Sequence, residues 1–214
     1  LPRRQNPHMH LYEAMLALHE VADHPEAAAR AEKLRAQLES RFLDPQTRII
    51  GEFFDDDWRP QAESDVVEPG HHAEWSWLLH QHARIAERAP EPLAAHFLAF
   101  AAGGADPETG FVFDGVSHSN APRLRSRRIW PQTELAKAWL VAHKRGHAGA
   151  IEAADRILGA VSRRYLSVPV PGGWIDKFDG AGNPVGNTMP ASTLYHLFGA
   201  AAETHRILSA ADPG

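Results

Sequence analysis

The sequence predicts an all-α chain built from repeated helical hairpins, and three observations lead to this fold class. Four segments of similar pattern recur along the chain at spacings near sixty residues. Each carries a proline near its start and then runs apolar for roughly three turns, which is typical of a largely buried helix. More amphipathic stretches alternate with these four segments. Because one such unit cannot bury its own apolar faces, the units must stack or close into a ring.

The four apolar segments are expected to be equivalent inner helices. Their prolines are separated by 62, 62 and 59 positions and are Pro7, Pro69, Pro131 and Pro190. Proline suits the first turn of a helix because its missing N–H would have no intrahelical partner there. The segments read NPHMHLYEAMLALHE, EPGHHAEWSWLLHQH, IWPQTELAKAWLVAH and TMPASTLYHLFGAAAE. In a closed ring, their amino ends and the loops before them would surround a central cavity.

The stretches between the inner helices predict outer helices followed by short β-excursions. Amphipathic runs starting at Pro25, Pro90 and Gly149 carry their charges on one side, as solvent-backed helices do. Runs of β-forming residues then follow, RIIGEFFDD, GFVFDGV and GWIDKFD, each containing aspartate. We expect these runs to form hairpins or extended loops that precede the next inner helix.

The composition excludes several classes of partner and site. A net charge of -5, with Lys and Arg scattered along 214 residues, indicates neither nucleic-acid nor membrane binding. Without cysteine there is no disulfide framework and no thiolate metal site, and we expect a cytoplasmic protein. No apolar run reaches the roughly 20 residues of a membrane span. We expect residues 1–214 to form a single domain, and Leu1 in place of methionine indicates a start within a longer protein.

Polar residues at the amino ends of the inner helices are the candidate site. Two of these helices carry a histidine followed three positions later by a glutamate, a spacing that places both side chains on one helix face. These pairs are His10 with Glu13 and His71 with Glu74. The third and fourth helices contribute Trp130, Gln132, Glu134, Ser192, Tyr195 and His196. A closed ring would bring these side chains together in one pocket.

Such a set suits proton abstraction next to a carbonyl group. The positive end of the helix dipole disfavours an imidazolium, so His71 would stay neutral and act as the base. Glu74, one turn on, would fix its tautomer and stabilise the imidazolium once formed. A second histidine would return the proton, and tryptophan would offer an apolar face to a sugar ring.

Structural roles compete with this hypothesis at each position. His71 with Glu74 would also serve as a helix-capping pair, and His196 would also serve as a hydrogen-bonded core histidine. We expect His8 and His72 to lie at the surface or behind the site, and Trp75 and Trp77 to lie in the core. A metal site is not expected, because the adjacent His71 and His72 point about 100° apart on a helix and cannot both ligate one ion. Nothing in the sequence matches a dinucleotide-binding or phosphate-binding loop.

The four helix-start motifs closely resemble those of the N-acylglucosamine 2-epimerase superfamily, especially its mannose isomerase-like branch. The resemblance rests on RQNPHMHLYEAMLAL, EPGHHAEWSWLL, RIWPQTELAKAWL and MPASTLYHLF and spans nearly the whole chain. It implies an (α/α)6 barrel of six inner and six outer helices that needs no cofactor and no metal. With four inner helices, the chain matches the C-terminal part of such a barrel. A partial ring would expose apolar helix faces, and a homodimer would be one way to cover them.

The resemblance also implies roles for individual residues. The two catalytic histidines of the family match His71 and His196, with Glu74 as their acidic partner. The further substrate-binding positions match His10, Glu13, Trp130 and, without a motif to fix it, Arg59.

The sequence therefore predicts an isomerase that converts an open-chain mannose-type aldose to a ketose through a cis-enediolate. Epimerisation at C2 of an N-acylglucosamine or of cellobiose is the first alternative, and it differs only in where the proton returns. Two alternatives of another class are a glycoside hydrolase, which needs two carboxylates, and a non-catalytic sugar-binding array.

Overall fold

The computed structural model describes residues 2–61 and 65–209, and it confirms the all-α prediction. The helices are α1 (Asn6–Ala22), α2 (Pro25–Gln37), α3 (Pro69–Ile85), α4 (Pro92–Gly103), α5 (Ile129–Lys144), α6 (Ala150–Val161) and α7 (Ala191–Ser209). Single π-helical turns extend two of the outer helices, at Leu38–Phe42 after α2 and Ser162–Leu166 after α6. Proline occupies the first turn of α1 to α4, as its missing N–H favours.

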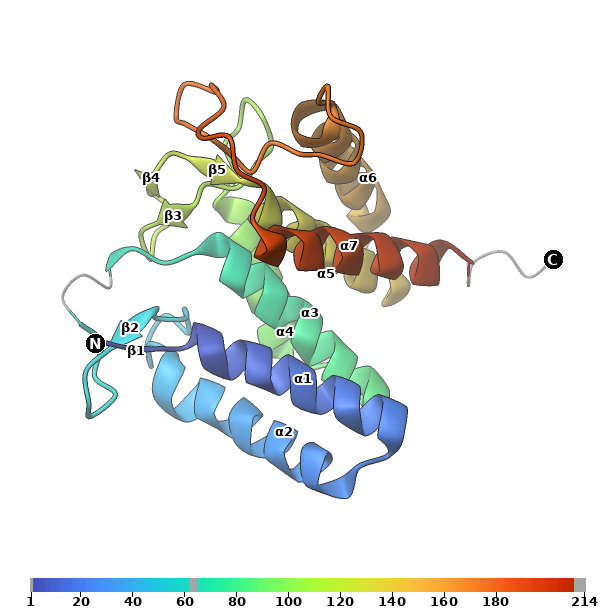
Figure 1. Ribbon diagram of the computed structural model, residues 1–214. Helices are drawn as coiled ribbons and strands as arrows, with labels where there is room; N and C mark the ends of the chain where they lie inside the picture. The colour runs from blue at the N-terminus through green and yellow to red at the C-terminus, as the bar shows by residue number, and fades with distance from the viewer. Residues whose placement is uncertain (1, 62–64, 210–214) are drawn as a thin grey trace.

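The four predicted inner helices lie next to one another in chain order, α1 against α3, α3 against α5, and α5 against α7 (Figure 1). Each of the first three is backed by an outer helix, α2 behind α1, α4 behind α3 and α6 behind α5. The structure is therefore an arc of helical hairpins, which is part of an α/α barrel. In Figure 1 the amino ends of α1, α3 and α7 lie toward the left, on the side of the β-strands.

Burial follows the position of each helix in the arc. The central inner helices α3 and α5 are buried on nearly all sides, and they include buried polar residues such as Glu74 and Glu134. The end helices bury one face only, so Leu11 and Val21 on α1 and Phe198 on α7 are exposed. This difference is expected because α1 and α7 are the ends of the arc, and each packs extensively against one inner helix, α3 and α5 respectively.

The β-excursions are confirmed as short antiparallel pairs. The strands are β1 (Arg3–Arg4), β2 (Phe53–Phe54), β3 (Gly115–Val116), β4 (Pro122–Leu124), β5 (Arg127–Arg128) and β6 (Lys177–Phe178). β1 pairs with β2, β3 with β4, and β5 with β6. The pairs β1–β2 and β5–β6 tie an excursion to the segment that enters an inner helix, α1 and α5 respectively. The excursions thereby hold the amino ends of the inner helices in place.

The repeat seen in the sequence is reproduced in the register of these pairs. Isolated bridges join Phe54 to Pro60 and Phe178 to Pro184, 124 positions apart in the chain, and Val116 pairs with Pro122 midway between them. The repeated unit is therefore a unit of three-dimensional structure. Within the described ranges, no helix has the length and apolar character that crossing a membrane requires.

Candidate active site

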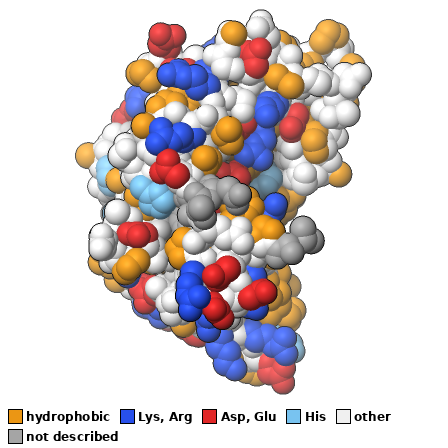
Figure 2. Space-filling view, turned by 90° about the vertical axis from the view of Figure 1, so that its left-hand side faces the viewer, with side chains coloured by type: hydrophobic (Ala, Val, Ile, Leu, Met, Phe, Trp, Pro, Cys, Tyr) orange, Lys and Arg blue, Asp and Glu red, His pale blue; other side chains and the backbone are white. Residues whose placement is uncertain are grey.

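A cavity of about 330 Å³ opens at the amino ends of the inner helices. All four inner helices contribute to its lining, which the β-excursions and the helix-entry segments complete. The lining residues are Arg4, Asn6, His10, Glu52, Phe53, Glu68, His71, Glu74, Arg128, Trp130, Ser192, Thr193 and His196. On the side of the molecule from which these amino ends are seen, acidic, basic and histidine side chains are mixed (Figure 2). The structure thus brings His10, His71 and His196 to one cavity, as the helix-start motifs predict.

His71 lies in the first turn of α3 and is held at both ring nitrogens. Its Nδ1 lies 2.9 Å from Glu52 Oε2, and its Nε2 lies 2.9 Å from the side-chain amide of Asn6. Glu52 also accepts the backbone N–H of Glu68, the residue that caps α3. The carboxylate that orients His71 is therefore Glu52, and the expected pairing of His71 with Glu74 is wrong. Residue 74 is on the same helix, but no hydrogen bond joins it to His71.

The charge state of His71 also differs from the sequence-based expectation. Burial lowers the pKa of its imidazole, but the negative charges of Glu52, Glu68 and Glu74 outweigh burial and raise this pKa to about 9. The nearby carboxylates therefore overcome the helix dipole, which alone would favour the neutral ring. At neutral pH His71 is therefore an imidazolium, and its Nε2–H is matched when the side-chain amide of Asn6 turns its oxygen toward it.

His196 approaches the cavity from α7 and has its own carboxylate. Its Nδ1 lies 2.8 Å from Glu134 Oε1 on α5, and both residues are buried. Since Nδ1 is engaged by a carboxylate, Nε2 is the ring nitrogen left for exchange with a substrate. Both histidines thus have a carboxylate at Nδ1 and line the cavity, and they differ at Nε2, where His71 contacts Asn6.

Trp130 lies close to both histidines. Its ring centroid is 5.2 Å from that of His71 and 5.2 Å from that of His196, with interplanar angles of 35° and 32°. The close approach depends on Gly70, where an added Cβ would lie 2.7 Å from the Trp130 ring. Trp130 therefore lines the cavity next to both histidines, and its role as an aromatic wall for a sugar stays a prediction.

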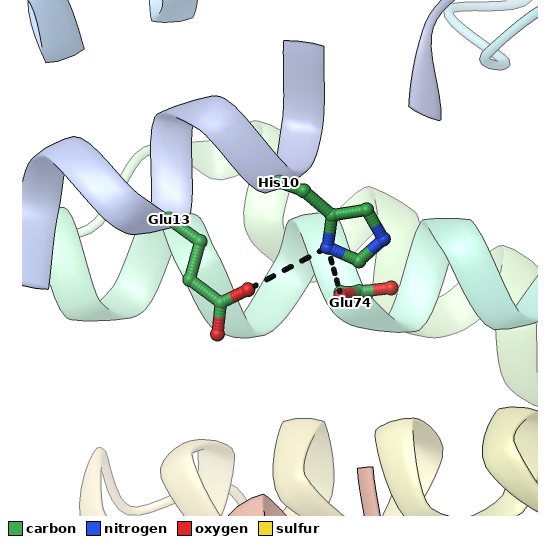
Figure 3. A group of neighbouring side chains, drawn as sticks. All are labelled: His10, Glu13 and Glu74. Carbon is green, nitrogen blue, oxygen red and sulfur yellow. Dashed lines mark ion pairs between the residues drawn. The ribbon is translucent and has the colours of Figure 1, made fainter. Parts of the chain in front are cut away.

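His10 is the centre of a second group, with Glu13 and Glu74 (Figure 3). The His10 Nδ1 lies 3.6 Å from Glu74 Oε1 and 3.7 Å from Glu13 Oε2. Glu13 raises the pKa of His10 above its usual value, against the opposing effect of burial. Glu74 is fully buried, and neither of its oxygens has a hydrogen-bond partner among the described residues. Burial and the charge of Glu134 raise the pKa of Glu74 to about 7, so this carboxyl group holds a proton for much of the time near neutral pH.

Comparison with known proteins now identifies the family. The sequence model of the N-acylglucosamine 2-epimerase (GlcNAc 2-epimerase) family matches residues 1–200. The chain belongs to this family.

Individual relatives agree with this assignment. A mannose-6-phosphate isomerase of Rhizobium meliloti (strain 1021) is 38% identical over 216 residues, which cover 92% of this chain and 53% of the relative. A cellobiose 2-epimerase of Bacteroides fragilis is 30% identical over 117 residues, which cover 52% of this chain and 29% of the relative. A crystal structure of a D-mannose isomerase superposes with a TM-score of 0.82 at 21% identity, over 98% of this chain and 57% of that one. The chain thus spans about half the length of the first of these relatives.

Arg59 does not reach the cavity in this member of the N-acylglucosamine 2-epimerase family. Its side chain is 74% exposed and pairs with Asp57, with 3.1 Å between Nη1 and the carboxylate. Two other arginines, Arg4 and Arg128, line the cavity instead. They enter it because β1 and β5 lead directly into α1 and α5, a placement that follows from the strand pairing and not from the motifs.

His72 is buried, which excludes a surface position and agrees with the other expected one, behind the site. It hydrogen-bonds the Ile50 N–H and the Glu68 carbonyl, with distances of 3.0 Å and 3.0 Å, and it packs against Phe100. Burial lowers the pKa of His72 to about 4, so its ring is neutral and serves the structure.

Glu52 and Asn6, like Arg4 and Arg128, are cavity residues that the helix-start motifs did not predict. Glu52 belongs to a series of acidic residues spaced by 62 positions, with Asp114 and Asp176. Each binds the start of the inner helix that follows it, since Asp114 accepts the Arg128 N–H and Asp176 accepts the Thr193 hydroxyl. The 62-position repeat therefore predicts an acidic residue at position 52. This signal is visible only when whole repeats are compared, because the spacing is longer than one helix.

Three groups of side chains bring potential metal ligands within 4.8 Å of one another. They are His10, Glu13 and Glu74; Glu52, Glu68 and His71; and Glu74, Glu134 and His196. In the second and third groups, the histidine Nδ1 is already hydrogen-bonded to a carboxylate. The expectation of a metal-free site therefore stays a prediction, tested below.

Proposed function

We propose that the protein is a sugar isomerase that converts an open-chain mannose-type aldose to the ketose through a cis-enediolate, with His71 and His196 as its acid and base. The supporting observation is the placement of these two histidines in one cavity, each near Trp130 and each with a carboxylate at Nδ1. Because the chain spans about half the length of the mannose-6-phosphate isomerase that it matches, the activity of the whole protein is a proposal.

The two histidines are proposed to have different roles in the reaction. His196 takes the proton from C2 through Nε2, and Glu134 stabilises the imidazolium that forms. The His71 imidazolium donates a hydrogen bond to O1 of the sugar, where negative charge develops in the enediolate. His71 gives its proton to O1 and then takes the proton of the O2 hydroxyl, which moves the negative charge of the enediolate to O2. Return of the proton from His196 to C1 then gives the ketose, and both histidines regain their starting charge. A positioned acid or base of this kind contributes about 10²–10⁴-fold to the rate.

Glu74 and Trp130 are proposed to hold the substrate. A protonated carboxyl group with no partner can donate to one sugar hydroxyl and accept from another, which suits the buried Glu74. Trp130 offers an apolar surface to the carbon chain of the sugar. His10 and Glu13 complete this side of the cavity, next to Glu74.

Epimerisation at C2 is the closest alternative. It would use the same cavity, with the second histidine returning the proton to the opposite face of C2. The similarity of the chain to a cellobiose 2-epimerase supports this alternative. Glycoside hydrolysis is less well supported, because Glu68 is paired with Arg128 and Glu134 with His196, which leaves Glu74 without the second free carboxylate the reaction needs.

The charges of the lining favour an unphosphorylated sugar. Three carboxylates, Glu52, Glu68 and Glu74, face two guanidinium groups, Arg4 and Arg128. Arg128 moreover forms ion pairs with Glu68 and Asp114, with nitrogen–oxygen distances of 2.7 and 3.2 Å. A phosphate group would therefore meet few free positive charges, although one relative bears the name mannose-6-phosphate isomerase. The homodimer, the cytoplasmic location and the single-domain organisation stay predictions.

Incubation of the full-length protein with mannose in D₂O tests the proposal. Deuterium at C1 of the fructose formed is the expected result, and deuterium at C2 of glucose would show epimerisation instead. A parallel incubation with mannose 6-phosphate should be slower; a faster reaction would contradict the preference for an unphosphorylated sugar. Absence of exchange with all of these sugars would contradict the isomerase proposal and favour the non-catalytic sugar-binding alternative. His96, exposed on the outer helix α4, provides the control variant His96→Ala, which should exchange like the wild type.

A further inference from the structure

Lys137 is a buried cation that the proposed mechanism does not use. It lies on α5, its side chain is 1% exposed, and its Nζ lies 2.8 Å from Glu134 Oε2. The same Nζ lies 3.8 Å from the ring centroid of Trp77 on α3. Burying an ammonium group is costly unless a paired charge compensates for it, and Lys137 is not at the cavity wall. Its placement therefore calls for an explanation beyond packing.

The explanation lies in the carboxylate that Lys137 contacts. Glu134 is fully buried and has one oxygen on Lys137 and the other on His196 Nδ1, at 2.8 Å each. A continuous path of charged contacts thus runs from Lys137 through Glu134 to the histidine that faces the cavity. His71 has no counterpart of this arrangement, since its carboxylate, Glu52, is bonded to the neutral amide of Gln5.

We propose that Lys137 is a positioning residue that offsets part of the negative charge of Glu134 and thereby sets the tautomer and lowers the proton affinity of His196. This inference rests on the proposed function, in which His196 takes the C2 proton. Lys137 itself touches neither the cavity nor the substrate, so its effect passes through Glu134.

The neighbouring carboxyl group shows why a fixed cation is needed. Glu74 and Glu134 face each other across the buried end of the site, and two carboxylates so close compete for one proton. Burial raises the pKa of Glu134, but Lys137 and His196 outweigh burial and hold that pKa below its usual value. The pKa of Glu74 is raised instead. Lys137 therefore helps decide which of the two carboxyl groups carries the charge, and the charge is placed behind His196.

The other charged groups near His196 do not replace Lys137. They come from each helix packed around it: Glu134 and Lys137 from α5, Glu74 and, beyond Trp130, His71 from α3, and His10 and Glu13 from α1, with Tyr195 beside it on α7. Tyr195 donates its hydroxyl to Glu13. Of these groups only Lys137 is a permanent cation in contact with Glu134.

The sign of the effect follows from these charges. In Lys137→Met, the apolar stem stays and the positive charge disappears, so Glu134 acts on His196 alone and favours its imidazolium more strongly. The pKa of His196 should rise, on the order of one unit for a unit charge at this range. In Glu134→Gln, the imidazolium loses its partner, and the pKa of His196 should fall.

Two readouts test the proposal on the full-length protein. The first is the NMR titration of the His196 ring, which needs no substrate and so tests the link even if the protein does not isomerise sugars. The second is the pH profile of kcat/KM for deuterium exchange, whose acid limb should move upward by about one pH unit in Lys137→Met, as the His196 titration does. Wild-type exchange, measured in the same assay, decides the proposed function separately.

Lys144→Met is the matched control, because Lys144 is an exposed lysine on the same helix. It should leave both readouts at the wild-type values. Opposite shifts of the His196 titration in Lys137→Met and Glu134→Gln support the proposal. An unchanged or lowered His196 pKa in folded Lys137→Met would overturn it and reduce Lys137 to a structural role. If that variant does not fold, the Glu134→Gln titration decides alone, and a pKa that fails to fall overturns the proposal.

Discussion

The Nδ1 of His71 is bound by Glu52, a residue from the β-excursion that precedes its helix, at 2.9 Å. Both side chains are almost completely buried. This contact fixes the ring orientation of His71 and supplies much of the negative charge that keeps the imidazole protonated.

Replacement of Glu52 should therefore weaken His71 as an acid. In Glu52→Gln, the pKa of His71 should fall from about 9 toward or below its ordinary value, because burial then acts with less opposition. We expect kcat/KM for exchange at pH 8 to fall by about 10- to 100-fold, the range seen when a partner of an acid or base is lost. The exposed Glu152→Gln on α6 serves as a control and should be unaffected. An alkaline limb that stays in place in Glu52→Gln would contradict the role given to Glu52.

The stability of the protein should depend on pH through the same pair. The folded-state pKa of His71, about 9, lies above the ordinary histidine value of 6.5. A raised pKa stabilises the fold fully below about pH 6.5, and this contribution is lost as the pH rises toward and through about 9. Urea unfolding between pH 6 and 10 should show this decline in the wild type and a shallower one in His71→Asn. Equal slopes in the two proteins would show that His71 is not the group responsible.

Gly70 is expected to be necessary for the position of Trp130. A methyl group at residue 70 would lie 2.7 Å from the tryptophan ring, so Gly70→Ala must displace it. Overpacking of this kind costs about 1–3 kcal/mol, and loss of the aromatic wall should lower kcat/KM at least tenfold. Gly159→Ala on α6 is a suitable comparison, because an alanine there meets only the flexible Arg163 side chain and favours the helix. Wild-type kinetics in Gly70→Ala would show that the Trp130 position does not matter.

Much of this site could be predicted from the sequence, because many of its residues lie at fixed positions in the motifs that start the inner helices. Proline spacing located the four helix starts, and residues such as His71, Trp130 and His196 follow directly from those starts. Glu52 could not be found by spacing within one helix, since it reaches His71 from a strand pair. Arg59 was placed wrongly for the same reason: proximity in sequence to a motif does not determine which arginine the chain folds toward the cavity.

The metal-free expectation has a direct test. Prolonged dialysis against EDTA should leave the rate of exchange within about twofold of the starting value, because a proton-transfer reaction of this kind needs only the two histidines. Metal analysis of the active protein should find less than one ion per ten chains, on the order of what adventitious binding leaves. Loss of activity that added Zn²⁺ or Mn²⁺ restores would show that one of the three histidine and glutamate groups holds a metal.

The measurement closest to the proposed chemistry is the loss of deuterium from C2-deuterated mannose to water, in His71→Asn and His196→Asn proteins that retain the wild-type circular dichroism. We expect His196→Asn to lose the label at least 100-fold more slowly than the wild type, since it lacks the base, and His71→Asn to be slowed by about 10²–10⁴-fold because the enediolate loses its proton donor. Label loss at the wild-type rate in either variant would show that the two histidines beside Trp130 do not carry the reaction.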